Sequence, residues 1–223
     1  MTVPRDRRTA WIAGATGLVG GQLLDQLLAD PAYGRVIALG RRALDRGHAK
    51  LDARVVAFDE LDLVDLPRPD EVYCTLGTTI RRAGSQDAFR RVDYDFVVAL
   101  ARRAVALGAG QFLVVTAIGA SPRSRIFYSR VKGEVERDTA ALPFRAVHVF
   151  RPSFLDGDRA ESRPGERIGL AVFRVIAPLL VGPARKYRAI DAATVARAMR
   201  SAALSGASGL RVYESDEIER MGK

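Results

Sequence analysis

The sequence predicts an α/β protein built on a doubly wound parallel sheet of about seven strands, flanked by helices. Short runs of apolar, often β-branched residues alternate along the chain with longer segments whose apolar residues recur at helical spacing. Several short runs are apolar at every position, as expected when both faces of a sheet are covered. Such alternation is typical of a parallel sheet with helical crossovers. With 223 residues, 48% of them hydrophobic, the chain has the size of one such domain.

This pattern predicts seven strands and five helices in one domain over residues 1–223. The strands are expected at Thr9–Ala13, Arg35–Leu39, Arg54–Phe58, Glu71–Leu76, Gln111–Thr116, Arg145–Phe150 and Leu210–Tyr213. The helices are expected at Leu18–Ala29, Gln86–Leu107, Arg125–Ala140, Gly169–Leu180 and Asp191–Leu204. The stretch Asp156–Glu166 contains Pro164-Gly165 and is expected to be a loop. It lies in the segment 151–190, which we expect to form a small C-terminal region.

The charge of the chain favours a solvated basic surface over a nucleic-acid interface. The formal net charge is +9, and only four of the 35 basic residues are lysine. A basic protein attracts anions and nucleic acid. The arginines, however, occur in scattered pairs, without a long basic run and without alternating aromatic residues. We therefore expect a solvated arginine-rich surface, with RNA or anion binding through that surface as the less favoured alternative.

Cysteine, histidine and hydropathy patterns predict a cytoplasmic protein without a metal site or a membrane span. The single cysteine, Cys74, cannot form an internal disulfide and fits a reducing compartment. His48 and His148 stand alone, and no cluster has the spacing of metal ligands. No apolar stretch reaches the roughly 18 residues of a membrane span, and no signal-peptide core follows the first residues.

A glycine-rich turn between the first strand and the first helix predicts a dinucleotide phosphate site. The turn reads Gly14-Ala15-Thr16-Gly17-Leu18-Val19-Gly20. A strand, a glycine turn and a helix in this order present free backbone N–H groups to an anion. Glycine is needed where a Cβ would block the turn, the pyrophosphate or the packing of helix on strand. The alternative is a tight turn that binds nothing. The candidate binding residues here are Gly14, Thr16, Gly17, Leu18, Val19 and Gly20.

Two arginines at the end of the second strand predict a preference for NADP(H). In NAD sites an acidic residue near this point binds the ribose hydroxyl, but here Arg41 and Arg42 follow Gly40. The planar fork of an arginine can hold a 2′-phosphate. The alternative is a solvated pair at a strand end. We also expect Asp59, after the third strand, either to accept from the adenine amino group or to be solvated.

The fourth strand is expected to bring small residues to the cofactor. It ends in Cys74-Thr75-Leu76-Gly77-Thr78-Thr79. A small residue at a strand end lets backbone approach a ligand closely, and the carboxyl ends of parallel strands form the binding crevice. The candidate cofactor contacts of this segment are Leu76, Gly77 and Thr78.

Tyr128 and Lys132 are the candidate catalytic pair. Residues at i and i+4 share one face of a helix, so the phenol and the ammonium can point into one site. A tyrosine titrates near pH ~10, and a neighbouring cation favours its phenolate. The pair can then move a proton to or from a carbonyl or alcohol oxygen. Thr116, or secondarily Ser121, is expected to supply a hydroxyl that positions this oxygen.

The chain resembles the short-chain dehydrogenase/reductase superfamily in its atypical branch. The segments that match in family order are Gly14–Gly20, Leu39–Arg42, Cys74–Thr79 and Tyr128–Lys132. Further segments are similar to the Tat-interacting-protein-like oxidoreductases, namely Tyr128–Glu136, Phe150-Arg151-Pro152 and Glu161–Glu166. The resemblance implies an NADP(H)-binding Rossmann domain with a small C-terminal substrate region. It departs at Thr116-Ala117, where relatives usually carry Ser-Ser.

Together these features predict an NADP(H)-dependent oxidoreductase acting on a small carbonyl or alcohol substrate. Tyr128 is expected to be the acid or base, Lys132 to hold the nicotinamide ribose, and Thr116 to position the substrate oxygen. The alternative is a regulatory or sensor protein that binds NADPH and a protein partner with little or no turnover.

Overall fold

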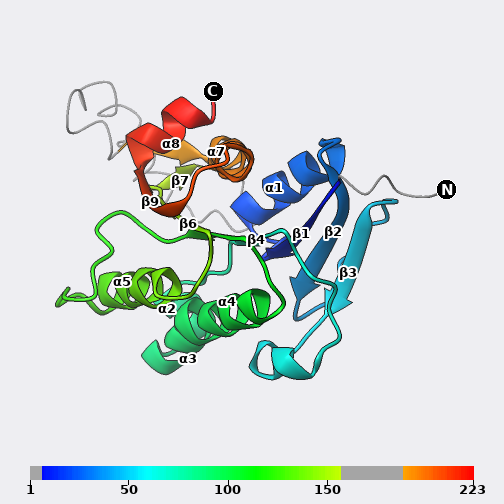
Figure 1. Cartoon of the computed structure of the whole chain (residues 1–223). Coiled ribbons are helices and arrows are strands. Elements are labelled where there is room, and N and C mark those ends of the chain that lie inside the picture. Colours follow the sequence, from blue (N-terminus) through cyan, green and yellow to red (C-terminus); the bar gives the residue numbers. More distant parts are fainter. Residues whose placement is uncertain (1–6, 157–187) are drawn as a thin grey trace.

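The computed structural model describes residues 7–156 and 188–223, and it has the predicted doubly wound architecture (Figure 1). The main sheet has seven strands in the order β3-β2-β1-β4-β5-β6-β9. Every neighbouring pair is parallel. The order reverses between β1 and β4, and in open α/β sheets ligands bind at such a switch point. The expected helix Gly169–Leu180 lies outside the described residues.

The seven strands correspond one to one with the seven predicted runs. They are β1 (Arg8–Ala13), β2 (Tyr33–Gly40), β3 (Leu51–Val55), β4 (Glu71–Cys74), β5 (Gln111–Val115), β6 (Ala146–Arg151) and β9 (Gly209–Glu214). A second, two-stranded sheet joins β7 (Leu155–Asp156) to β8 (Ile190–Asp191). The described part of the segment 151–190 therefore contributes a short strand from each end.

Helices cover both faces of the main sheet. They are α1 (Leu18–Ala29), α2 (Ile80–Ala83), α3 (Gln86–Arg90), α4 (Phe96–Ala106), α5 (Phe127–Ala140), α7 (Ala192–Leu204) and α8 (Ser215–Met221), with a 3₁₀ helix η1 (Phe58–Leu63) and a π-helix η2 (Arg91–Asp95). Helices α1 and α7 pack side by side on one face, and α4 and α5 lie on the other (Figure 1). Each face has its own apolar core. Among the described helices none is long and apolar enough to cross a membrane.

Two predicted elements differ from the structure in an informative way. The third strand runs over 51–55 instead of 54–58, because Phe58 begins η1 and packs its ring against Phe96 of α4. The helix expected over 86–107 is continuous in direction but contains the π turn η2 between α3 and α4. Apolar spacing located both segments, but it could not distinguish a buried turn from a strand or a π turn from an α turn.

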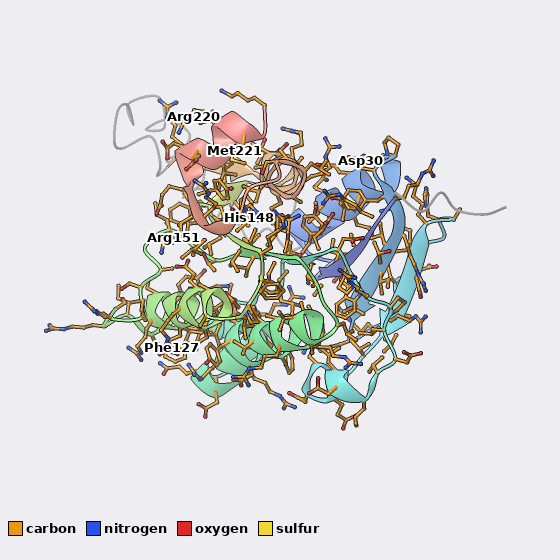
Figure 2. The ribbon with its side chains drawn as sticks, in the orientation of Figure 1. Asp30, Phe127, His148, Arg151, Arg220 and Met221 are labelled. Carbon is orange, nitrogen blue, oxygen red and sulfur yellow. The ribbon has the colours of Figure 1, made fainter. Side chains whose placement is uncertain are left out.

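A buried polar network stabilises the edge of the sheet at β5, β6 and β9. The ring of His148 has no exposed surface, and Figure 2 labels it inside the molecule. Its Nδ1 lies 3.0 Å from the hydroxyl of Tyr213, and its Nε2 lies 3.3 Å from Oε1 of Gln111. Burial, together with Arg145 and Arg211, lowers the pKa of His148 to about 4. His148 is thus a neutral core residue in the folded protein.

The pH dependence of stability tests this assignment. Because the pKa of His148 is lower in the folded chain than the ordinary value of ~6.5, its contribution to stability is present above pH ~6.5 and is lost as pH falls toward 4. Between pH 7 and pH 4.5 the free energy of unfolding, measured with urea, should fall less in His148→Gln than in wild type. The difference should be on the order of 2 kcal/mol. His48→Gln is the matched control, since His48 is exposed. Equal pH profiles for wild type and His148→Gln would contradict the assignment.

Candidate functional site

A cavity of about 240 Å³ lies at the carboxyl ends of β1, β2 and β4, where the strand order reverses. Its lining includes eight residues that the sequence analysis predicted: Gly14, Thr16, Gly17, Arg41, Arg42, Leu76, Gly77 and Thr78. It also includes residues that the sequence analysis did not select, among them Ala15, Arg54, Phe58, Thr75, Arg82 and Phe96. Leu18, Val19 and Gly20 form the first turn of α1 behind this lining. The predicted segments therefore converge on one pocket.

The glycines of the turn have two distinct roles. Gly14 has a φ of +91°, and a Cβ there would lie 2.6 Å from Oγ1 of Thr75 on the β4 side. A Cβ on Gly20 would overlap the carbonyl oxygen of Gly14. These two glycines are thus required for the turn to pack against β4. Gly17 is exposed at the start of α1 and faces the pocket, and its Cβ would lie 3.2 Å from the oxygen of Gly14.

The pocket is strongly basic. Its lining contains four arginines, Arg41, Arg42, Arg54 and Arg82, and none of the described lining residues carries a carboxylate. Arg54 is held by Asp52, whose oxygens accept from Nε at 2.6 Å and from Nη2 at 3.0 Å. These bonds lower the pKa of Asp52 to about 2. The pocket therefore presents arginines where a ribose-binding NAD site has an acidic residue.

Asp59 lies outside the pocket lining, which favours the second of its two expected roles, a solvated residue. It is exposed, and its carboxylate accepts from Nη2 of Arg91 at 2.5 Å. The preceding residue, Phe58, lines the pocket and stacks on Phe96 with ring centroids 5.3 Å apart. Arg41 lies over the same Phe96 ring, with its Cζ 6.0 Å from the centroid. The end of the pocket near the arginines is therefore bounded by stacked aromatic rings.

The predicted catalytic residues Tyr128 and Lys132 lie on α5 and are not among the residues that line this pocket. The side chain of Lys132 is 6% exposed, and Nζ lies 2.7 Å from Oδ1 of Asp93. A Cβ built on Gly77 would lie 3.8 Å from the same Nζ, so the ammonium lies next to Gly77, one of the lining residues. Burial opposes the charge of Lys132, but Asp93 and Tyr128 outweigh it and raise its pKa. Tyr128 is half-buried on the same helix, with its ring centroid 5.6 Å from that of Phe89.

Asp93, the ion-pair partner of Lys132, is a further residue that sequence reasoning missed. It belongs to the π-helix η2 and is fully buried, whereas the neighbouring Asp95 is exposed. Its Oδ2 accepts from the backbone N–H of Thr78 at 2.8 Å. The only sequence signal was an aspartate within an otherwise apolar helical stripe, and such a residue is usually solvated.

The hydroxyl of Thr116 is directed into a structural network. It donates to Oε1 of Glu136 at 2.6 Å, and Thr116 itself is buried. Arg151 lies between α5 and the end of β9 (Figure 2), donating to both oxygens of Glu136 at 3.0 and 2.6 Å and to Glu214 at 3.1 Å. The geometry therefore does not support Thr116 as the residue that positions a substrate oxygen.

Ser121, the second candidate hydroxyl, belongs to a loop held against α5. Its backbone N–H donates to the carbonyl of Ser129 at 3.0 Å, and its Oγ accepts from the N–H of Arg123 at 3.3 Å. A Cβ on Gly133 would overlap the backbone of Ser121, so the loop and the helix are in close contact. A serine Oγ that accepts one bond still has its proton to donate.

The described part of the chain offers this site a buried cysteine and no cluster of metal ligands. Cys74 is fully buried at the end of β4, and burial raises the pKa of its thiol to about 12. It therefore behaves as a small apolar residue. Within residues 7–156 and 188–223 no group of three or more acidic, cysteine or histidine side chains could hold a metal ion.

Known proteins with similar sequences establish the family. The chain is 36% identical to protein HTATIP2 of Rattus norvegicus over 222 residues, which cover 97% of this chain and 90% of that protein. It is 32% identical over 209 residues to the mitochondrial protein fmp52 of Aspergillus clavatus, covering 89% and 88% of the two chains. No family model matches. The chain belongs to the HTATIP2 and FMP52 family of atypical short-chain dehydrogenases/reductases.

Solved structures agree with this assignment at the level of the fold. MoeE5 in complex with UDP-glucose and NAD has a TM-score of 0.70 and 20% identity, over 96% of this chain and 80% of that one. Human SDR39U1 with NADPH has a TM-score of 0.62 and 20% identity, over 92% and 73% of the two chains. The fold is thus an NAD(P)-binding Rossmann fold of the short-chain dehydrogenase type. Because the fungal relatives are named mitochondrial, the cytoplasmic location stays a prediction.

Two glycine substitutions test the geometry of the turn. Gly20→Ala should lower the free energy of unfolding by about 3 kcal/mol, because its methyl group has no space against the oxygen of Gly14. Gly17→Ala should lower the free energy of unfolding by under about 1 kcal/mol, because the φ of −84° suits any residue and Gly17 lines the open pocket. Chemical denaturation measures both. Similar losses for the two variants, or the reverse order, would show that the turn packs differently.

Proposed function

We propose that this protein is an NADP(H)-dependent oxidoreductase that transfers hydride between the nicotinamide and a small carbonyl or alcohol compound. One observation carries the proposal: the ammonium of Lys132, four residues from Tyr128, lies next to Gly77, which lines the same pocket as the glycine turn and the arginines. A nucleotide-binding end and a proton-transferring pair would then meet near the ends of the central strands. A bound nicotinamide cofactor would supply or accept the hydride.

The donor set of the pocket fits a dinucleotide phosphate. Exposed Gly17 leaves space beside the N-terminus of α1, where the first N–H groups of a helix have no partner within it. Arg41 and Arg42 are exposed at the end of β2, and each can form charge-assisted bonds to a 2′-phosphate. Phe58 and Phe96 close this end with apolar rings.

The reacting end relies on Tyr128 and Lys132. Tyr128 would donate a proton to a carbonyl oxygen during reduction, or accept one from an alcohol during oxidation. Lys132 would hold the ribose hydroxyls next to the nicotinamide and favour the phenolate of Tyr128 by its charge. We assign the substrate side to the segment 151–190, most of which lies outside the described residues.

A second function is favoured by one observation, the use of the Thr116 hydroxyl by Glu136. Because Ala117, the next residue, has no hydroxyl, the end of β5 provides no side-chain donor to a substrate oxygen. A protein that binds NADPH and a protein partner, with little turnover, would need only the nucleotide end of the pocket. Turnover measurements separate this regulator from the oxidoreductase.

The arginine pair should determine cofactor preference. Calorimetric titration is expected to show tighter binding of NADPH than of NADH. Substituting Arg41→Ala and Arg42→Ala together should weaken NADPH alone by about 1–3 kcal/mol, the typical value of bonds to charged groups. Arg46→Ala is the matched control, because Arg46 is exposed on the same loop, pairs with Asp25 and lies outside the pocket lining. Equal affinities of wild type for the two cofactors would refute the 2′-phosphate assignment.

The phenol of Tyr128 should be needed for turnover and not for cofactor binding. We expect Tyr128→Phe to reduce NADPH oxidation by about 10²–10⁴-fold across a panel of aldehydes, ketones and quinones, with unchanged NADPH affinity. Lys132→Met should impair both. Tyr94→Phe is the control, since it also removes a phenol hydroxyl, here one that donates to Asp138 at 2.6 Å.

The same assay decides between the two functions. A wild-type protein that turns over no better than Tyr128→Phe contradicts the role of Tyr128 as proton donor. Tight NADPH binding without reduction of any compound in the panel favours the regulator.

A further inference from the structure

Asp93 is a fully buried carboxylate whose two oxygens contact two different parts of the candidate site. Oδ1 forms the 2.7 Å ion pair with Lys132, and Oδ2 accepts the 2.8 Å bond from the N–H of Thr78. Thr78 lines the pocket, and the ammonium of Lys132 lies next to Gly77, which lines it as well. A single side chain thus links the loop after β4 to the lysine of α5.

The backbone around Asp93 is unusual. Residues Arg91–Asp95 form a π-helix between two α-helical segments, and both flanking residues, Arg90 and Phe96, keep helical backbone angles. Such π turns are rare and occur frequently at functional sites. A buried carboxylate is also costly unless a cation and further hydrogen bonds compensate it. At Asp93 the cation is Lys132 and the hydrogen bond comes from the N–H of Thr78.

We propose that Asp93 is a positioning residue that keeps Lys132 charged and directed at Gly77, so that cofactor binding persists as the pH rises. The effect on the cofactor rests on the proposed function, whereas the effect on Lys132 does not. Three groups act on the ammonium: Asp93 from η2, the phenol of Tyr128 from its own helix, and the thiol of Cys74 from β4. Asp93 is the only carboxylate among these three groups.

The charge balance at Lys132 explains this role. Burial lowers the pKa of a lysine, by up to several units from its ordinary ~10.4, and at Lys132 the carboxylate of Asp93 is the largest factor in the opposite direction. Asp93→Asn keeps the size of the side chain and an oxygen for the N–H of Thr78, but it removes the negative charge. Burial would then dominate, and Lys132 would lose its proton at a lower pH.

A pH titration of the lysine itself tests the proposal without any cofactor. The chain has four lysines, so the Cε signals of ¹³C-lysine protein can be assigned with Lys132→Met. In Asp93→Asn the transition of Lys132 should move down by about two pH units or more, and in wild type Lys132 should still be charged at pH 10. Asp95→Asn, an exposed aspartate of the same π turn, should match wild type. An unmoved transition in folded Asp93→Asn overturns the proposal.

Cofactor binding provides the second readout. The ratio of the NADPH Kd of Asp93→Asn to that of wild type should rise between pH 6.5 and pH 10, reaching about tenfold at pH 10, while Asp95→Asn stays within about twofold of wild type. A constant ratio would indicate a purely structural role and overturn the proposal.

If wild type binds no NADPH, the proposed function fails, and the lysine titration alone decides the role of Asp93. If Asp93→Asn does not fold, a wild-type Lys132 that is neutral at pH 10 overturns the proposal.

Discussion

The close packing of the glycine turn against the end of β4 is the constraint on which the site depends. Gly14 and Gly20 have no room for a Cβ. At Gly14 the Cβ would meet Thr75, and at Gly20 it would meet the carbonyl oxygen of Gly14. Thr75 in turn donates its hydroxyl to the carbonyl of Ala13 at 3.0 Å, which joins β1 to β4 at the switch point. This contact places the start of α1 beside the loop Leu76–Thr78. The cavity lies between these two segments.

Charge is distributed in the site in two different ways. The Lys132–Asp93 pair is buried, and it is tolerated because each charge has a close partner. Arg41 and Arg42 are exposed, so they retain their hydration and remain available to a ligand. Rigid, compensated charge thus lies at the proposed reacting end, and exposed cationic charge lies at the proposed nucleotide end. Such a division suits a pocket that must orient one end of a ligand and attract the other.

Sequence reasoning predicted the features that depend on local pattern. The strand and helix around the glycine turn were expected at Thr9–Ala13 and Leu18–Ala29 and occur at Arg8–Ala13 and Leu18–Ala29, since apolar spacing and glycine chemistry are local properties. The arginines after β2 and the Tyr128–Lys132 pair were also identifiable, because their positions follow from strand ends and helical spacing.

The features that the sequence did not predict depend on distant partners. The direction of the Thr116 hydroxyl is determined by Glu136, twenty residues away on α5 and itself held by Arg151. The burial of Asp93 depends on a π turn, which no residue pattern distinguishes from an ordinary helix. Asp59 follows β3, whose position was shifted by three residues in the prediction, and it pairs with Arg91 instead of facing the pocket.

A crystal structure of the protein with NADP(H) tests the central claim most directly. The account predicts that the pyrophosphate lies at Gly17, the 2′-phosphate at Arg41 and Arg42, and the nicotinamide ribose within hydrogen-bond distance of Lys132. Electron density for the cofactor elsewhere, or a 2′-phosphate directed away from both arginines, would contradict it.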